Sequence, residues 1–209
     1  MRRLPVLLLV ASLVVPSLAR ADATAVDQSF QTYRTAIMAS DGAKAASVVT
    51  QGSHDLYRQY ADQALTLDRS GLNGLHVMDR TNVLLLRHSL DRPRMETMSG
   101  EEIIAFAVDQ GWIGKEGAER LQLGDYEVAG DAATGTVLAA DGRRTSFKLQ
   151  FLKEAERWRL DLVSMLNITR TAIEYSVRQS GMTEDEFLFL VLEISTGRKA
   201  GPEIWNPPS

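Results

Sequence analysis

The sequence predicts an α+β fold in which N-terminal helices pack on a curved antiparallel sheet of about four strands, with two C-terminal helices. Three patterns support this prediction. Apolar residues recur at helical spacing through much of residues 26–120, and they alternate with polar residues through residues 146–163. A second helical pattern occupies residues 166–195. The alternating stretch is the most informative, because a period of two fixes which side chains share a sheet face.

The first residues read as a secretory signal peptide that covers residues 1–21. A basic start is followed by an apolar run, residues 4–19, and the small residues Ala19 and Ala21 then mark a cleavage site. The apolar run is too short to favour a permanent membrane span, although an uncleaved anchor is the alternative. We therefore expect a periplasmic or secreted protein that begins at Asp22 and keeps no stable membrane span.

The composition of the chain excludes several classes of function. The chain has no cysteine, which excludes disulfides, thiol catalysis and an acylated N-terminal cysteine. Beyond residue 21 the net charge is −7, because the predicted signal peptide removes three of the 23 basic residues and none of the 27 acidic ones. That balance argues against nucleic acid as a partner. The remaining length suits one domain over residues 22–196, followed by an irregular, proline-containing tail over residues 197–209.

Helical patterns dominate the first half of the chain. Asp41, Ser53 and Ser99 are candidate N-cap residues, and Ser99 begins a capping box. The predicted helices cover residues 26–39, 41–49, 53–65, 79–90 and 99–107, with a short helical piece that ends near residue 120.

Strands follow over residues 121–128 and 134–140 and in a hairpin over residues 146–163. The apolar parity switches at Gly124-Asp125, which indicates a bulge. Asp141-Gly142 predicts a two-residue type I′ turn.

The hairpin over residues 146–163 supplies six large apolar side chains to one face of the sheet, each worth roughly 2 kcal/mol when buried. These are Phe147, Leu149, Phe151, Trp158, Leu160 and Leu162. Arg159 is expected on the opposite, solvent-facing side.

Two helices are expected to close the domain. The first carries an apolar stripe, and Gly181 separates it from a capping box that begins at Thr183. In the second helix we expect a stripe at i, i+3, i+4 and i+7 to face the domain, formed by Phe187, Leu190, Val191 and Ile194. A fifth strand over residues 187–194 is the alternative, since short apolar runs are ambiguous.

In its pattern of helices followed by a sheet with this hairpin, the chain resembles the nuclear-transport-factor-2-like (cystatin-like, cone-shaped) superfamily, including its secreted bacterial members of unknown function. The resemblance covers residues 22–50 and 121–162. It rests on Phe30, Tyr33 and Ala36 in the first helix and on Phe147, Leu149, Phe151, Lys153, Glu154, Trp158, Leu160 and Asp161 in the hairpin.

The resemblance implies a cavity between the first helix and the concave sheet face. The chain departs from the family by a helical insert at about residues 72–120 and by two helices in place of the last strand, and both could fill or cover that cavity. Enzymes of the family often hold an Asp with a Tyr, or a His–Asp pair, in the pocket. No such motif can be matched residue by residue here, so we assign no catalytic residue.

Tyr57, Tyr60 and Tyr126 are the candidate ligand-binding residues, because each combines a large apolar ring with a polar tip. Ordinary core packing of these rings is the alternative. His54, His76 and His88 show no metal-ligand spacing, and we expect neither a metal nor a cofactor.

These observations favour an exported, non-enzymatic module that binds a small apolar ligand or a partner protein, or forms a homo-oligomer. The alternative is a small isomerase or hydrolase that acts in a cone-shaped cavity, with the three tyrosines or His76 as its polar groups. A polar-lined pocket that contains a carboxylate would favour the enzyme. A filled cone with an exposed apolar helix face would favour the interaction protein.

Overall fold

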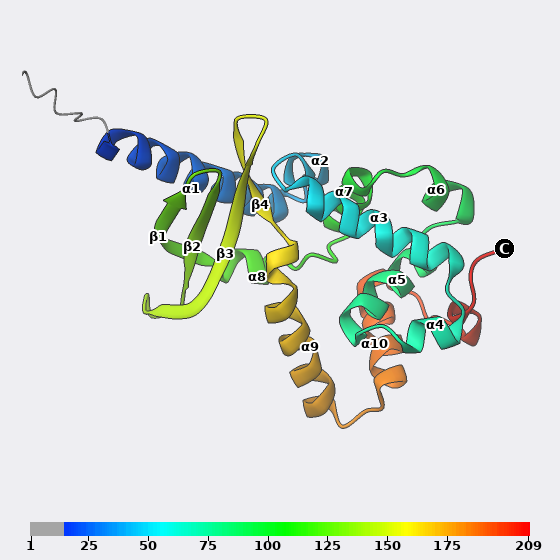
Figure 1. Ribbon diagram of the computed structural model, residues 1–209. Helices are drawn as coiled ribbons and strands as arrows, with labels where there is room; N and C mark the ends of the chain where they lie inside the picture. The colour runs from blue at the N-terminus through cyan, green and yellow to red at the C-terminus, as the bar shows by residue number, and fades with distance from the viewer. Residues whose placement is uncertain (1–14) are drawn as a thin grey trace, which may run out of the picture.

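The computed structural model describes residues 15–209, so the first part of the predicted signal peptide, residues 1–14, lies outside the described residues. It confirms the α+β class, with helices before and after one antiparallel sheet (Figure 1). The strands follow one another in the order β1-β2-β3-β4. They are β1 (Gln122–Ala129), β2 (Ala132–Leu138), β3 (Arg144–Glu154) and β4 (Arg157–Asp161).

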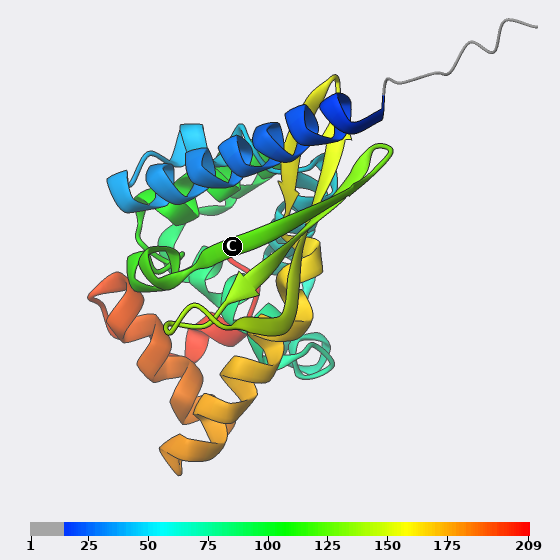
Figure 2. The same ribbon diagram turned by 90° about the vertical axis from the view of Figure 1, so that its left-hand side faces the viewer.

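Eight helices described in residues 15–120 precede the sheet: α1 (Val15–Ala39), α2 (Gly42–Ala46), α3 (Gln51–Thr66), α4 (Arg69–Asn73), α5 (Val77–Ser89), α6 (Arg92–Thr97), α7 (Gly100–Asp109) and α8 (Lys115–Arg120). After the sheet come the 3₁₀ turn η1 (Val163–Met165), α9 (Leu166–Ser180), α10 (Glu184–Thr196) and the 3₁₀ turn η2 (Pro202–Trp205). In Figure 2, α1 runs across the sheet and the α9–α10 hairpin extends away from it.

Of the four predicted N-caps, Asp41, Ser99 and Thr183 are confirmed and Ser53 is wrong. The Asp41 carboxylate accepts a hydrogen bond from the Lys44 backbone N–H, and Ser99 forms its capping box with Glu102. The cap of α3 is Thr50 rather than Ser53. Thr50 has an extended backbone because its N–H pairs with Leu160 of β4, and this places its side chain at the helix start.

The predicted bulge in β1 is confirmed, since the pairing register shifts between Gly124 and Tyr126 and the intervening Asp125 has a φ of 48°. The predicted type I′ turn at Asp141-Gly142 is wrong, because only Gly142 has a positive φ. The Gly142 N–H donates to the Ala139 carbonyl at 2.8 Å, which closes a three-residue loop.

The tight turn that needs two consecutive positive φ angles lies between β3 and β4. Ala155 and Glu156 have φ angles of 47° and 61°. Neither residue type signals such a turn, so the sequence pattern favours the Asp-Gly pair instead.

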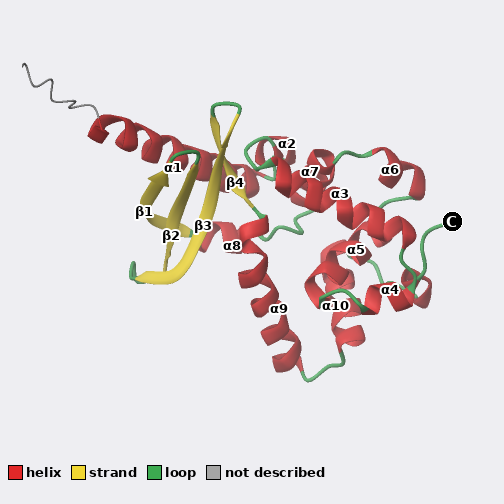
Figure 3. Cartoon of the chain, viewed as in Figure 1, coloured by secondary structure: helices red, strands yellow, loops and turns green. Residues whose placement is uncertain are grey.

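The core consists of two apolar clusters. The sheet cluster lies between α1, α2 and one sheet face, and its fully buried members include Phe30, Ile37, Val49, Ile104, Leu149, Phe151 and Leu160. The helical cluster lies between α3, α5, α7, α10 and the tail, and it includes Leu72, Leu84, Leu86, Met95, Ile103, Leu188 and Leu192. Figure 3 shows the strands gathered at one end of the molecule and most helices at the other.

The prediction that all six apolar side chains of the hairpin are buried is wrong for Phe147. Five of the six alternating apolar residues are buried, but Phe147 is 49% exposed. β3 pairs with β4 only from Gln150 to Glu154, so Phe147 lies beyond the end of its neighbouring strand. The alternation identifies the face of the strand, but it cannot show how far the covering elements extend.

Arg159 also differs from the expectation of a free, solvent-facing side chain. Its guanidinium Nη1 donates to the Ser47 carbonyl at 2.8 Å and to the Val49 carbonyl at 3.3 Å. Leu160 of β4 forms a bridge with Val49 at the same place. The segment between α2 and α3 therefore covers the β4 edge of the sheet.

Residues 187–194 form a helix rather than a fifth strand, but the predicted inward face is wrong. Leu188 and Leu192 are buried, whereas Leu190 is 37% and Ile194 is 73% exposed. The apolar residues surround the helix, so the sequence offers two candidate faces and packing against α5 selects the Leu188 face.

The C-terminal tail is packed against the helical cluster. Ile204 and Trp205 are buried, and the Trp205 ring meets Phe189 of α10 edge to face at 5.7 Å. The buried Arg87 donates to the Ile204 carbonyl at 3.2 Å. Although an irregular tail is expected from the sequence, the segment contains the turn η2 and covers one side of α10.

Candidate ligand-binding site

A cavity of about 260 Å³ lies where the sheet cluster meets the helical cluster. Its volume equals that of about nine water molecules, at roughly 30 Å³ each. Side chains from α1, α3, α5, α7, the segment after α7 and the start of α9 line it. The cavity is therefore built from elements that are distant in sequence.

Two of the predicted ligand-binding residues, Tyr57 and Tyr60, line this cavity. They stand one turn apart on α3, and their rings meet edge to face with centroids 5.6 Å apart. Tyr33 of α1 lines the same cavity from the opposite cluster. Sequence reasoning places Tyr33 on the buried face of the first helix but does not name it as a site residue.

Tyr126 does not line the cavity. It lies on β1, where its hydroxyl donates to the Asp27 carboxylate of α1 at 2.7 Å and its ring meets Phe151 at 6.3 Å. This tyrosine packs between the sheet and α1, away from the other three.

The three cavity tyrosines differ in how their hydroxyls are used. The Tyr60 hydroxyl donates to Asp79 Oδ1 at 2.8 Å, and Asp79 Oδ2 accepts from Arg170 of α9 at 2.7 Å. Asp79 is 8% exposed, so this is a buried network at the side of the cavity. The hydroxyls of Tyr33 and Tyr57 make no hydrogen bond within the described part of the chain.

These phenols are protonated at neutral pH, and burial raises their pKa further above it. It raises the pKa of Tyr57 from its ordinary 10.0 to about 12. Burial also raises the pKa of Tyr33, with a smaller contribution from the Tyr57 phenol, and that of Tyr60, with a further contribution from Asp79. At neutral pH all three phenols can donate a hydrogen bond, and none is a base.

The rest of the cavity wall is apolar or neutral. Asn82 donates its side-chain amide to the Met78 carbonyl at 3.2 Å, and the Thr169 hydroxyl donates to the Met165 carbonyl at 3.0 Å. Leucine, methionine, isoleucine and tryptophan side chains supply most of the remaining surface. Among the described residues, the lining includes no carboxylate, histidine, lysine or arginine.

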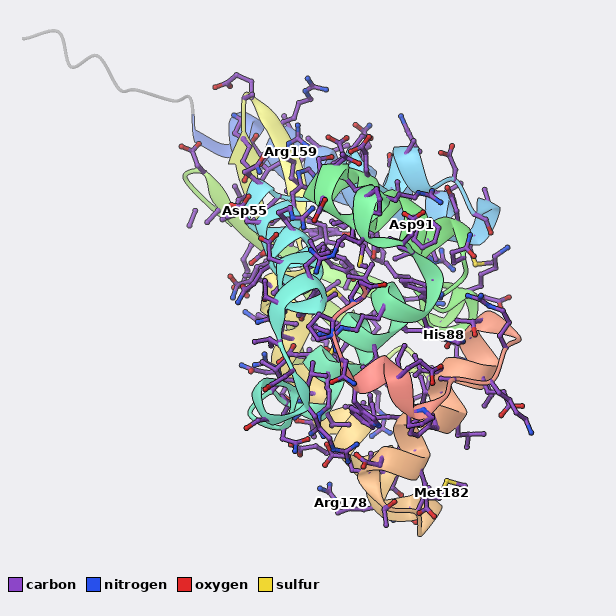
Figure 4. The ribbon with its side chains drawn as sticks, turned by 90° about the vertical axis from the view of Figure 1, so that its right-hand side faces the viewer. Asp55, His88, Asp91, Arg159, Arg178 and Met182 are labelled. Atoms are coloured by element: carbon purple, nitrogen blue, oxygen red, sulfur yellow. The ribbon has the colours of Figure 1, made fainter. Side chains whose placement is uncertain are left out.

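The histidines occupy structural positions. His76 caps α5, with Nδ1 accepting from the Met78 N–H at 3.1 Å and Nε2 bonded to Glu174 at 2.9 Å. His54 and His88 bond to backbone carbonyls, and Figure 4 shows His88 near the end of α10. In residues 15–209 no group of three or more histidines or acidic residues could hold a metal ion.

Two glycines allow α7 to lie close to its neighbours. A Cβ at Gly100 would lie 1.9 Å from the His54 carbonyl oxygen of α3. A Cβ at Gly42 would lie 2.0 Å from the Ala105 carbonyl oxygen. Only glycine permits these backbone contacts.

Comparisons of the chain with protein-family models, with curated proteins and with solved structures found no match. Of the helices in the described range, none combines the length and the apolar character needed to cross a membrane.

Proposed function

We propose that the protein is a non-enzymatic module that binds a small apolar ligand in the cavity between its two clusters. The observation that carries this proposal is a cavity of about 260 Å³ whose described lining is apolar or neutral. Ligand sites are commonly concave and mostly apolar, with a few polar groups that fix orientation. The volume suits a molecule of one or two rings.

The isomerase or hydrolase alternative finds less support. The phenols remain protonated at neutral pH, and the one nearby carboxylate identified, Asp79, is held by Tyr60 and Arg170. General acid–base catalysis needs a group that titrates near the working pH within reach of the substrate. His76, the other candidate, caps α5 instead of lining the cavity.

The binding proposal is tested with 2-ethylnaphthalene, an apolar probe without hydrogen-bonding atoms. At a free concentration of ten times its Kd, binding stabilises the fold by about 1.4 kcal/mol and raises the melting temperature by about 3–6 °C. Ala107→Leu places a larger side chain into the cavity and should abolish this shift.

The matched control is Ala172→Leu, the same change on the surface of α9 outside the cavity, which should keep the shift. An Ala107→Leu protein that binds the probe as well as wild type would place the binding elsewhere.

We also propose export to the periplasm or beyond, with cleavage after Ala21. Support comes from Asp22, the residue that would follow the cut, whose carboxylate accepts from the Trp158 indole N–H at 3.1 Å. This contact would survive cleavage, whereas the hydrogen bond from the Thr24 hydroxyl to the Arg20 carbonyl within α1 would be lost. Mass spectrometry of the exported protein should give Asp22 as its first residue, and a chain that retains residues 4–19 would refute this proposal.

Membership of the nuclear-transport-factor-2-like superfamily is part of the same proposal. The crossing of α1 over an antiparallel sheet supports it. The insert over residues 72–120 supplies α5 and α7, and both helices line the cavity together with α9. The described lining includes no residue of β1–β4, so this cavity is not the one between the first helix and the concave sheet face that the resemblance implies.

One observation favours a second function, association between two copies of this chain. The outer face of α10 exposes Leu190 and Ile194, with acidic residues 184–186 at one end and Arg198 and Lys199 beyond the other. Within the chain, Asp185 already pairs with Arg69, Glu184 with Arg80, and Arg198 donates to the His88 carbonyl, so a second copy would contact the exposed Leu190 and Ile194 rather than free charges. Light scattering should show a dimer that Ile194→Asp dissociates without unfolding, and a monomeric wild type would refute the association.

A further inference from the structure

Two tyrosine hydroxyls at the cavity have no partner among residues 15–209. The Tyr33 side chain is 6% exposed and Tyr57 is half-buried, and neither hydroxyl makes a hydrogen bond with a described residue, although each hydroxyl is accessible from the cavity. Buried polar groups in native proteins almost always have a partner. Tyr60 and Tyr126 follow that rule, since each donates to a carboxylate, at 2.8 and 2.7 Å.

Both tyrosines line the same cavity. Tyr33 comes from α1 in the sheet cluster, and Tyr57 comes from α3. The two phenols are close enough for the charge of one to act on the other, which contributes to the raised pKa of Tyr33. Two donors from separate elements therefore face a shared space with no acceptor provided by the described chain.

The surroundings select against charge on the bound molecule. A carboxylate or phosphate would lose its hydration in a cavity whose described lining carries no lysine, arginine or histidine. Arg170 is already bonded to Asp79, the carboxylate that accepts from the Tyr60 hydroxyl. Neutral phenols at an uncharged wall match a neutral acceptor.

We propose that the ligand is a neutral apolar molecule with one hydrogen-bond acceptor, a carbonyl oxygen of a ketone, ester or amide, bound jointly by the hydroxyls of Tyr33 and Tyr57. This inference rests on the proposed binding function and specifies its ligand class. The apolar wall supplies affinity for the ring system, and the two hydroxyls orient it.

Three matched probes test the ligand class by calorimetric titration of the full chain. The probes are 2-acetylnaphthalene, 2-ethylnaphthalene and 2-naphthoate, which differ only in carrying a carbonyl, no acceptor or a negative charge. Two added hydrogen bonds should make the ketone bind at least about tenfold more tightly than the hydrocarbon. The carboxylate should bind more weakly than the ketone.

Removing the hydroxyls should remove that preference. Tyr33→Phe and Tyr57→Phe should each lower the affinity for 2-acetylnaphthalene, and the double variant should bring it to the level of 2-ethylnaphthalene. Affinity for 2-ethylnaphthalene should be at least that of wild type, because the hydrocarbon then leaves no hydroxyl without a partner, and this binding also shows that the variants fold. Tyr126→Phe removes a hydroxyl that bonds Asp27 away from the cavity and should change neither affinity.

The outcomes separate the two proposals. If 2-ethylnaphthalene binds but the ketone binds no better, or if the double variant keeps the ketone preference, the joint recognition by Tyr33 and Tyr57 is refuted while the cavity function stands. Tighter binding of 2-naphthoate than of the ketone refutes the neutral class. If neither neutral probe binds wild type, the proposed function itself fails.

Discussion

Adding one methyl group at Gly100 should destabilise the protein strongly, because α7 touches α3 through its backbone at this point. Gly100 is the first residue of α7, directly after the capping residue Ser99. A Cβ there would lie 1.9 Å from the His54 carbonyl oxygen and 2.5 Å from its carbonyl carbon. Both neighbours are backbone atoms, so no side-chain rotation can relieve the overlap.

The magnitude follows from the displacement required. An ordinary Cβ contact begins at 3.4 Å, so α3 and α7 must separate by more than an ångström. Overpacking of a close-packed core costs about 1–3 kcal/mol, and a rigid backbone contact belongs at the upper end, near 3 kcal/mol. For a chain of this size, that corresponds to a loss of about 6–12 °C in melting temperature.

Thermal and denaturant melts of Gly100→Ala measure this loss, with Gly117→Ala as the matched control. Gly117 lies within α8, where an added Cβ would have no atom within 4 Å, and its φ is not positive. Its replacement should therefore stabilise by up to about 1 kcal/mol. If Gly100→Ala has the same melting temperature as wild type, the close approach of α3 and α7 is refuted, and with it the geometry of the cavity.

Three further changes test other parts of the structure. In a denaturant melt, Trp158→Ala should lower the free energy of unfolding by about 3–5 kcal/mol. Leu152→Ala should lower it by only about 1 kcal/mol, because Leu152 is 39% exposed on the same sheet. Equal losses would contradict the assignment of the two sheet faces. Arg159→Ala should lower the free energy of unfolding by about 1–3 kcal/mol, because it removes the hydrogen bonds to the Ser47 and Val49 carbonyls. An unchanged free energy of unfolding would mean that these bonds do not stabilise the β4 edge. Folding raises the pKa of Tyr57 from 10.0 to about 12, so the stability linked to this phenol is complete below pH 10 and is lost as the pH rises toward 12. Across that range, the free energy of unfolding should fall less steeply with pH for Tyr57→Phe than for wild type.

The fold class could be predicted because local patterns encode it. Alternation identifies the β3–β4 hairpin, and the capping boxes at Ser99 and Thr183 mark the starts of α7 and α10. The errors arise where a neighbour decides the outcome. Phe147 is exposed because β4 is shorter than β3, and the inward face of α10 depends on which apolar stripe meets α5.

The candidate site was predictable only in part. Tyr57 and Tyr60 follow from their residue type and their position on one helix, and both line the cavity. Sequence reasoning missed Tyr33 as a site residue, although a tyrosine on a buried helical face has a hydroxyl that needs a partner. The Tyr126 hydroxyl, in contrast, donates to the Asp27 carboxylate. This contact joins β1 to α1, and no local sequence pattern reveals it.

Methyl NMR of the methionine side chains during titration with 2-acetylnaphthalene tests the cavity proposal most directly. Met78 and Met165 line the cavity, whereas Met38 is 40% exposed elsewhere and Met182 is 42% exposed at the tip of the α9–α10 hairpin (Figure 4). Binding in the cavity predicts saturable shifts of the Met78 and Met165 methyl signals, with Met38 and Met182 unchanged. Shifts centred on Met182, or none at Met78 and Met165, would contradict the proposal that this cavity is the binding site.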